Sequence, residues 1–457
     1  RDRGQPRTPS MTPQAPVTFR RVAGIALPVV LSNAAVPLQG AIDTAIIGNL
    51  GAAHYLAAVT LGATVITMVF SSFNFLQIGC SGLTAQALGA GDGRRVMNTL
   101  VRALLIGAAL SVVLMFASGG IAAVGLAIFE GSDAAEAEAR SYILIRFWGA
   151  PAEFANLAIM GWFVGQELTR RLFELQITIS LLNIALNLLF VLGLGWGVEG
   201  VALGTALAAW GGLALGLWRV RERALVMMPA GYRLDWQRIL KREELSQLFA
   251  LNVDLFIRTL CLTGSFLWVA RLGSLEGDLV LAANGVLLQF LHVSAYALDG
   301  FAMAAETLVG QSLGARDRDR LRRSVVISGL AALALAAVFA LLASLLAQPM
   351  INLFTNVDAV RENAGAHALW ATCLPVIAVI AYQLDGIFIG AADGKSMRNA
   401  MLVSTAVFLP LSWVLSETYG NHGLWASLWA LMIIRAATLG LRYPALEARA
   451  QTGLSHH

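Results

Sequence analysis

The sequence predicts an all-α membrane protein with twelve transmembrane helices, arranged as two parallel repeats of six helices each. Three observations lead to this prediction. Of the 457 residues, 57% are hydrophobic and only 13% are charged, about half the charged share of soluble domains. Apolar stretches of about 20 residues, long enough to cross a bilayer as helices, recur along the whole chain. The second half of the chain also repeats landmarks of the first half in the same order.

Twelve helical spans follow from the hydropathy of the sequence, with boundaries good to a few residues. They lie near 23–49, 55–87, 97–125, 139–165, 172–194, 198–218, 246–270, 279–311, 323–346, 366–390, 399–417 and 422–441. Because the apolar signal recurs to the end of the chain, it excludes a single signal peptide or membrane anchor.

Lysine and arginine gather on one side of this arrangement. Loops on the side of the two termini hold 25 of the 32 basic residues, whereas loops on the other side hold only Arg140, Arg271 and Arg361. Because cytoplasmic loops are enriched in Lys and Arg, we expect a multi-pass protein of the cell inner membrane with both termini in the cytoplasm. The net charge of +4 then reflects membrane orientation, and no nucleic-acid partner is expected.

The two halves share motifs at a nearly constant offset. Residues 86–92 read Gln-Ala-Leu-Gly-Ala-Gly-Asp, and residues 311–317, 225 positions later, read Gln-Ser-Leu-Gly-Ala-Arg-Asp. Gly161-Trp-Phe-Val-Gly165 and Gly386-Ile-Phe-Ile-Gly390 have the same offset. Six spans is an even number, so both copies keep one orientation, and parallel repeats with a cavity between them suit alternating access.

These landmarks divide the chain into five parts. We expect a disordered segment over 1–19, a first six-helix lobe over 20–218, a cytoplasmic linker over 219–245, a second six-helix lobe over 246–441 and a cytoplasmic tail over 442–457. The linker is hydrophilic and rich in arginine. We interpret it as a solvated loop that obeys the orientation rule, rather than as a site for anionic headgroups.

Polar side chains inside the apolar spans are the candidate functional residues, because a charged group at the bilayer centre costs at least about 2.5–3.5 kcal/mol. In the first span, Gln39 and Asp43 are four residues apart and share one helix face. Asn183 and Asn187 form a second pair at this spacing in the fifth span, and Thr205 follows in the sixth. The alternative is that the Asn and Thr side chains only cross-link helices.

The second half carries more charges inside its spans. Asp254 and Arg258 are four residues apart, and we predict that they act as a pair, either structural or part of a coupling device. Asp299 and Glu306 lie two turns apart on one face of the eighth span, and Asp385 repeats the Leu-Asp-Gly signature of Asp299. For these acids, functional, gating and packing roles stay open.

No enzyme motif is present. The sequence has no Gly-x-x-x-x-Gly-Lys-Ser/Thr loop, no His-Glu-x-x-His and no Gly-x-Ser-x-Gly elbow. We therefore predict neither enzymatic activity nor a cofactor, with energy drawn from an ion gradient or from the substrate's own gradient. Three further polar residues within spans are interpreted as structural: Glu153, His292 and Arg435.

Several stretches of the sequence, taken together, are characteristic enough to indicate a protein family. They are Asp43 in the first span, the paired Gln-x-Leu-Gly-Ala segments, Ala-Leu-Asn252-Val-Asp254-Leu-Phe-Ile-Arg258, Ala-Tyr-Ala-Leu-Asp299-Gly-Phe-Ala and Leu-Asp385-Gly-Ile-Phe-Ile-Gly. Over residues 20–442 the chain resembles the MATE (multidrug and toxic compound extrusion) family, DinF branch. The resemblance implies two lobes in a V-shaped arrangement, and export of amphipathic or cationic small molecules in exchange for protons or sodium ions.

By position, Asp43, Asn183, Asn187 and Thr205 correspond to a cation-linked polar cluster in the first lobe of this family. Many relatives carry Asp where this chain has Asn187. Because sodium favours several hard oxygen ligands, the missing carboxylate favours proton coupling, with sodium coupling as the alternative. Asp43 is then the predicted proton carrier, since burial disfavours its charged form, and Pro37 permits the bend that would link protonation to movement.

The substrate itself leaves no motif, so Gln39 is the only residue predicted to contact it. We expect a monomer in the lipid bilayer. A flippase of lipid-linked precursors, from the same wider superfamily, is the second alternative, although more spans or a strongly cationic central cavity would be expected of it. A passive channel would need a pore-lining filter or charge rings, and the two-lobe repeat argues against it.

Overall fold

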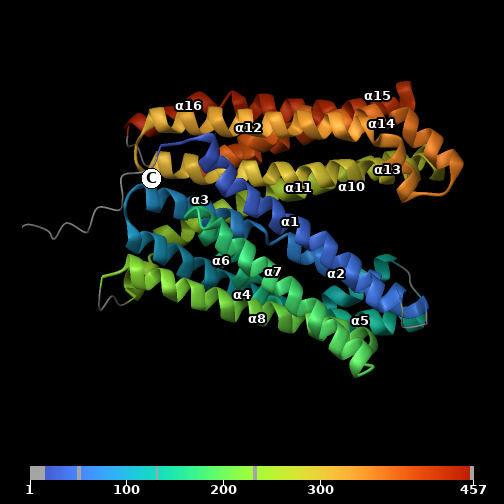
Figure 1. The fold of residues 1–457 in the computed structure, drawn as a ribbon, viewed down its shortest axis with the longest axis horizontal. Helices are drawn as coiled ribbons and strands as arrows, with labels where there is room; N and C mark the ends of the chain where they lie inside the picture. The colour runs from blue at the N-terminus through green and yellow to red at the C-terminus, as the bar shows by residue number, and fades with distance from the viewer. Residues whose placement is uncertain (1–15, 49–52, 130–131, 230–233, 453–457) are drawn as a thin grey trace, which may run out of the picture.

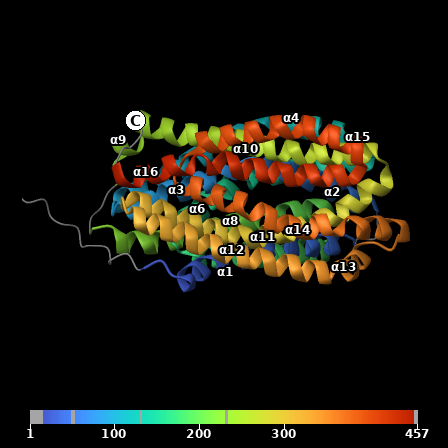
Figure 2. The same ribbon diagram turned by 90° about the horizontal axis from the view of Figure 1, so that it is seen from above.

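The computed structural model describes residues 16–48, 53–129, 132–229 and 234–452. Within these ranges the ordered elements are helices, and none is a strand, as the predicted all-α fold requires. The helices form two bundles that meet at one end and diverge at the other, so that the molecule has the shape of a V (Figure 1). Seen from above, the helices run along the long axis of the molecule (Figure 2).

The first half of the chain forms most of one bundle. Its helices are α1 (Phe19–Gly48), α2 (Ala53–Ser71), α3 (Phe75–Gly89), α4 (Gly93–Phe129), α5 (Asp133–Trp148), α6 (Ala150–Gly165), α7 (Thr169–Asn187), the π-helical turn η1 (Leu188–Gly193) and α8 (Gly197–Met227). The second half forms α9 (Trp236–Ile239), α10 (Arg242–Leu275), α11 (Asp278–Gly314), α12 (Arg318–Leu345), α13 (Ala347–Phe354), α14 (Asp358–Gly390), α15 (Gly394–Gly440) and α16 (Tyr443–Thr452). α1 packs against both α7 and α11 and so contacts both halves.

Ten helical stretches in the described ranges are long and apolar enough to cross a membrane. Two features account for the difference from the twelve predicted spans. The fourth predicted span is divided into α5 and α6 at Gly149, and each part is only 16 residues long. The last two predicted spans form α15, in which Gly420 has a non-helical φ of 57°. With these two features, the helices agree with the predicted twelve spans.

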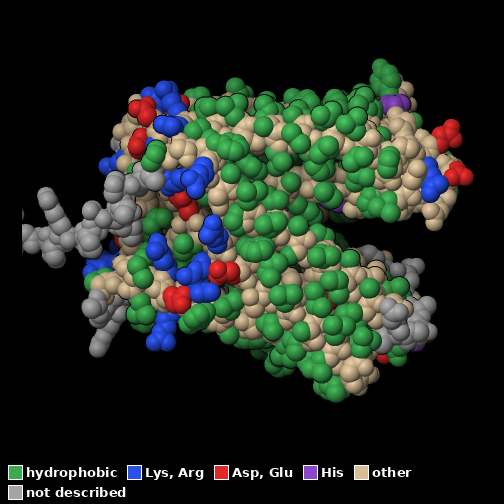
Figure 3. Space-filling model, viewed as in Figure 1, with side chains coloured by type: hydrophobic (Ala, Val, Ile, Leu, Met, Phe, Trp, Pro, Cys, Tyr) green, Lys and Arg blue, Asp and Glu red, His purple; other side chains and the backbone are tan. Residues whose placement is uncertain are grey.

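Charged side chains gather at the closed end of the V. Figure 3 shows Lys and Arg side chains where the bundles meet, and a gap between the bundles at the opposite end. We call the closed end, which includes Arg94, Arg171 and Arg318, the basic end. We call the opposite end, which includes α13 and Arg361, the open end. The surface between the two ends is largely hydrophobic, as contact with lipid requires.

The predicted linker over 219–245 contains more helix than expected. α8 continues to Met227, and within this extension Arg219 pairs with Glu222 at 3.1 Å, a spacing that stabilises a helix. After residues 230–233, which lie outside the described residues, α9 is held against α4 because Arg102 donates to two of its carbonyl oxygens, at 2.8 and 2.9 Å.

The predicted tail over 442–457 also contains a helix. α16 buries Leu446 and Ala450 against the second bundle. Glu447 of α16 pairs with Arg318 of α12 at 2.9 Å. The tail is therefore part of the packed structure as far as Thr452.

The repeated Gln-x-Leu-Gly-Ala motif forms the same turn in both halves, at the basic end. Gly91 and Arg316, 225 positions apart, have positive φ values of 71° and 56°, the left-handed conformation that ends many helices. Asp92 and Asp317 follow them, and each accepts a hydrogen bond at 2.9 Å from the backbone N–H three residues later. The two aspartates thus cap α4 and α12, which explains why the motif ends in Asp.

The same motif joins the two halves. A Cβ atom on Gly89 would collide with the carbonyl oxygen of Gln311, and a Cβ atom on Gly314 would collide with that of Gln86. Since Gly314 and Gln311 lie 225 positions after Gly89 and Gln86, the contact is reciprocal, as a pseudo-twofold axis between the repeats requires. The absence of side chains lets the backbones of α3 and α11 approach closely, and this contact closes the basic end.

The second repeated motif packs each half internally. Gly161 and Gly165 place α6 against the backbone of α3, and Gly386 and Gly390 place α14 against the backbone of α11. Glycines four residues apart are a common device for close packing of helices in membranes. Both sequence repeats therefore serve close helix contacts around α3 and α11.

Candidate functional site

The polar residues predicted in the first lobe lie together, in the half of the lobe nearer the open end. Asp43 Oδ1 accepts a hydrogen bond from Asn187 Nδ2 at 2.7 Å. Asn187 Nδ2 also lies 3.3 Å from Asn183 Oδ1, and Asn183 Nδ2 donates to Thr205 Oγ1 at 2.8 Å. The structure thus brings α1, α7 and α8 together through one chain of hydrogen bonds, which we call the Asp43 cluster.

Ser180 and Gly204 also belong to this site, although the sequence analysis did not single them out. Gln39 Oε1 accepts a hydrogen bond from Ser180 Oγ at 2.9 Å, so Ser180 extends the polar face of Asn183 by one turn. Gly204 makes room for Asn187, because a Cβ atom there would collide with Asn187 Oδ1. The π-helical turn η1 begins directly after Asn187, and such turns are frequent at functional sites.

The Asp43 cluster contains one carboxylate among neutral groups. Asp43 is half-buried. Arg146 of α5 is the basic residue whose charge acts on Asp43, but its guanidinium pairs with Glu153 at 3.1 Å. Asn187 Oδ1 is buried without a hydrogen-bond partner in the described structure. Amide and hydroxyl groups can stabilise either form of the carboxyl group, so this arrangement suits reversible binding of a proton or a small cation.

The acids of the second lobe have different surroundings. Asp385 of α14 contacts Arg258 of α10 and Arg435 of α15 through the same oxygen, Oδ2. The side chains of Asp385 and Arg435 are 9% and 2% exposed. Arg435 also lies over the ring of Tyr382, 5.9 Å from its centroid. Two guanidinium groups therefore hold this carboxylate, whereas Asp43 has no ion pair with an arginine among the described residues.

The predicted pairing of Asp254 with Arg258 is wrong. Asp254 pairs with Arg398 of α15 at 2.5 Å, close to the basic end, while Arg258 reaches the neighbouring helix α14. A spacing of four residues permits a pair within one helix, but a long arginine side chain can also satisfy a buried carboxylate on another helix, where an uncompensated charge is costly. Arg435, interpreted from the sequence as structural, is the second partner of Asp385.

Asp299 and Glu306 share a helix but not an environment. Asp299 Oδ2 accepts a hydrogen bond from Asn33 Nδ2 of α1 at 3.1 Å, and Asn33 also donates to the carbonyl oxygen of Tyr296 at 3.2 Å. Asp299 thus links α1 to the second half. Glu306, two turns nearer the basic end, is only 4% exposed. A single amide in a run of apolar residues offered little reason to select Asn33 from the sequence.

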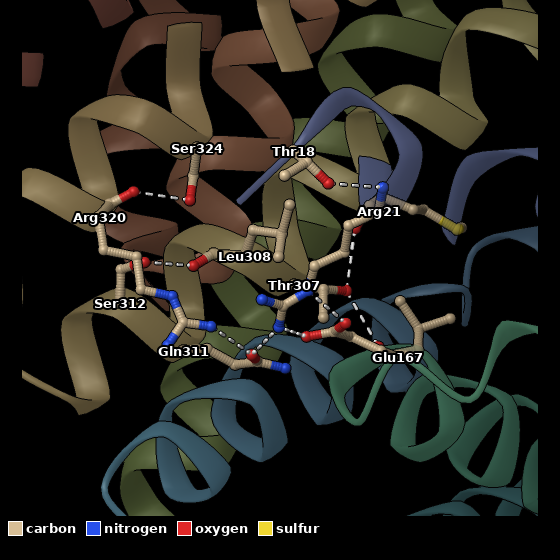
Figure 4. A network of polar contacts seen from close by, with 11 residues as sticks. Thr18, Arg21, Glu167, Thr307, Leu308, Gln311, Ser312, Arg320 and Ser324 are labelled. Carbon is tan, nitrogen blue, oxygen red and sulfur yellow. Dashed lines mark hydrogen bonds and ion pairs between the residues drawn. The ribbon is translucent and has the colours of Figure 1, made fainter. Parts of the chain in front are cut away.

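A polar network connects both halves at the basic end (Figure 4). Arg21 of α1 pairs with Glu167, which follows α6, at 2.5 Å. Gln311 Oε1 of α11 lies 3.5 Å from Arg21 Nη2 and 3.3 Å from Arg320 Nη2. Thr307 Oγ1 donates to a carbonyl oxygen of α6 at 3.0 Å. From the sequence, Arg21 and Arg320 contributed only to the orientation signal, whereas the structure places them across the junction of the lobes.

Asp385→Asn is expected to lower the thermal stability of the purified protein sharply. The change leaves Arg258 and Arg435 without their shared carboxylate, and removing one partner of a buried ion pair costs about 3–5 kcal/mol. Adding Arg435→Met should restore part of the loss. Asp254→Asn, in the more exposed pair with Arg398, should cost less. Size-exclusion profiles after heating measure these effects, and equal stability of the single and double variants would contradict the assignment.

The fold and the sites define a class of protein. Two parallel six-helix repeats, joined at one end and separated at the other, are the architecture of secondary transporters that work by alternating access. The MatE family profile matches this chain twice, over residues 28–189 and 255–414. The chain therefore belongs to the MATE (MatE) family of transporters, and the predictions of this family and of a protein that is not an enzyme are confirmed.

Comparison with known proteins supports this assignment along most of the chain. The chain is 36% identical to DNA damage-inducible protein F of Escherichia coli (strain K12) over 423 residues, which cover 91% of this chain and 90% of that protein. It is 28% identical to the probable multidrug resistance protein NorM of Bradyrhizobium diazoefficiens, covering 94% of each. A crystal structure described as MATE in the bent conformation has the same fold, with a TM-score of 0.85, 18% identity, and 95% and 97% of the two chains covered.

Proposed function

We propose that this protein is a proton-coupled antiporter that exports amphipathic or cationic small molecules. The observation that carries the proposal is the Asp43 cluster: a half-buried carboxylate that contacts Asn187 and no basic side chain in the described ranges. Such a group can bind a proton in one state of the transporter and release it in another. The multidrug resistance protein named among the relatives supports the substrate class.

We infer the orientation from the charges. The basic end, which holds both described termini (Figure 1), faces the cytoplasm of a cell with an inner membrane, because cytoplasmic loops are enriched in Lys and Arg. The open end then faces outward, and the V is an outward-facing state. Asp43, five residues before the end of α1 at Gly48, takes up its proton from outside in this state, and the protein works as a monomer.

The driving force is adequate for export. One net charge that moves through about 100 mV provides roughly 2.3 kcal/mol. At about 1.4 kcal/mol for each tenfold ratio, this supports a substrate gradient of roughly 40-fold.

The proposal is tested in proteoliposomes, with pH and sodium gradients imposed separately and a cationic dye such as ethidium as the probe. We expect dye transport under a pH gradient in sodium-free buffer, and none under a sodium gradient alone. If only the sodium gradient drives transport, the coupling ion is sodium and not the proton. Transport that responds to neither gradient would overturn the proposal of a cation-coupled antiporter.

Asn187→Asp is expected to shift the coupling towards sodium. The substitution places a second carboxylate next to Asp43, whose Oδ1 atom lies 2.7 Å from Asn187 Nδ2 in the wild type. Hard cations prefer sites with several charged oxygen ligands. The measurement is dye transport at a fixed pH gradient with increasing sodium. Asn183→Asp is the comparison variant, because it adds a carboxylate to the same cluster at a residue that contacts Asn187 and Thr205 but not Asp43, and its response to sodium should be weaker. An unchanged response to sodium would contradict this role of Asn187.

A further inference from the structure

Glu306 is a buried acid at the contact between the lobes. It is 4% exposed, and its Oε1 atom is buried without a hydrogen-bond partner in the described structure. α14 covers its backbone, since a Cβ atom on Gly390 would collide with the carbonyl oxygen of Glu306. Its side chain faces Ser81 of α3, in the other half of the chain. Glu306 therefore lies where α3 and α11 close the basic end.

No basic side chain compensates this acid among the residues that the structure describes. α3 carries no charged residue, and the single acid of α6, Glu153, lies at the far end of that helix. On α14, Asp385 is engaged by its two arginines. At the basic end, Arg21 of α1 contacts Glu167, and Arg320 of α12 contacts Gln311. Arg318 and Arg322 of α12 pair with Glu447 of α16. The other charged group that acts on Glu306 is Asp299 on its own helix, which is itself an acid.

The pseudo-symmetry singles out this position. Glu306 lies 225 positions after Ser81, so the two residues are equivalent in the two repeats, and they face each other across the contact between α3 and α11. The neighbouring glycines and glutamines are the same in both repeats, at Gly89 and Gly314 and at Gln86 and Gln311. A contact that required only close packing would be served by serine in both copies, yet the second copy carries a carboxyl group.

We propose that Glu306 is a proton-binding residue that controls the basic end, which closes only when Glu306 is neutral. An ionised carboxylate without a partner is strongly disfavoured in a buried site. Because closure buries Glu306, protonation stabilises the closed form, and loss of the proton stabilises the form in which the lobes separate and water reaches the carboxylate. Acidic conditions therefore favour closure of the basic end, and alkaline conditions favour its opening.

This inference rests on the proposed alternating-access transport and adds a second proton site to it. Asp43 binds the proton that drives export, whereas Glu306 couples the proton concentration on the side of the basic end to the position of the lobes. The two residues lie on different helices, α1 and α11. Their effects can therefore be separated, because one is measured as transport and the other as a distance in the absence of substrate.

The experiment measures the distance between spin labels at the exposed positions Arg94 of α4 and Arg323 of α12. The purified protein, with its three native cysteines replaced, is held in lipid nanodiscs without substrate and compared in acidic and alkaline buffer. We expect the distance to shift to longer values in alkaline buffer. Glu306→Gln, which has the same shape but cannot ionise, should lose this shift and keep the short distance in both buffers.

Three further variants make the result decisive. Glu306→Ser introduces the residue found at the equivalent position of the first repeat, and it should also lose the shift. If the Gln variant does not fold, the Ser variant tests the role of Glu306 instead. Glu199→Gln, an exposed acid of α8, should keep the wild-type shift. Asp43→Asn should keep it too, even though export is lost.

Two outcomes would overturn the role of Glu306. One is a wild-type distance that does not change with pH, and the other is a Glu306→Gln variant that opens as the wild type does. A protein whose distance responds through Glu306, but whose export does not depend on a pH gradient, would instead contradict the proposed function and leave this inference standing.

Discussion

Asp43→Asn is expected to abolish export driven by a pH gradient, while the protein remains folded and inserted in the membrane. The asparagine has the shape of the aspartate and can still accept the hydrogen bond that Asn187 donates at 2.7 Å. It cannot bind and release a proton, so the coupling of proton movement to substrate movement is lost. Because no other carboxylate belongs to the Asp43 cluster, we expect no residual coupling from this site.

The measurement is dye export and proton flux in the same proteoliposomes. Asp133→Asn is the matched control, since Asp133 is an exposed acid at the start of α5, and it should transport at the wild-type rate. If Asp43→Asn exports at the wild-type rate with the same proton flux, Asp43 is not the coupling residue. Asp299 and Asp385 would then be the first candidates for that role.

Gly89→Ala and Gly314→Ala are each expected to reduce export by at least about tenfold, which corresponds to about 1.4 kcal/mol in a two-state equilibrium. Alanine normally stabilises a helix relative to glycine. At these two positions, however, the added methyl group would collide with the backbone carbonyl oxygen of Gln311 or Gln86, and a backbone atom cannot move aside as a flexible side chain can. The closed form of the basic end is therefore destabilised, and the state with the open end accessible is lost.

Gly329→Ala provides the control for these variants, because nothing lies within 4 Å of a Cβ atom at that position of α12. It should export as the wild type does. The distance between labels at Arg94 and Arg323 should be longer in both interface variants and unchanged in the control. Wild-type export by Gly89→Ala, together with an unchanged distance, would show that this glycine contact does not hold the basic end closed.

The architecture was predictable because its signals are local. Each apolar stretch predicts a transmembrane helix without reference to the rest of the chain, and the repeated motifs can be found by comparing the two halves of the sequence. Asp43, Asn183, Asn187 and Thr205 were also predictable, since polar side chains are rare in transmembrane helices and each one needs a partner. The structure joins these four in one chain of hydrogen bonds. Helices in segments that lack a strong apolar signal were not expected: the end of α8, α9 and α16. The division of the fourth span into α5 and α6 was not predicted either.

The sequence by itself determined the fold class, the repeat and the members of the first-lobe cluster. The tertiary structure alone decided which charges meet. Arg258 pairs with Asp385 and not with Asp254, because a partner on a neighbouring helix, 127 positions away, leaves no trace in local spacing. In the same way, only the packing of α3 against α11 shows that Glu306 is buried away from water. The burial and pairing of charged side chains depend on contacts between residues distant in sequence, whereas transmembrane spans and internal repeats can be recognised from the sequence alone.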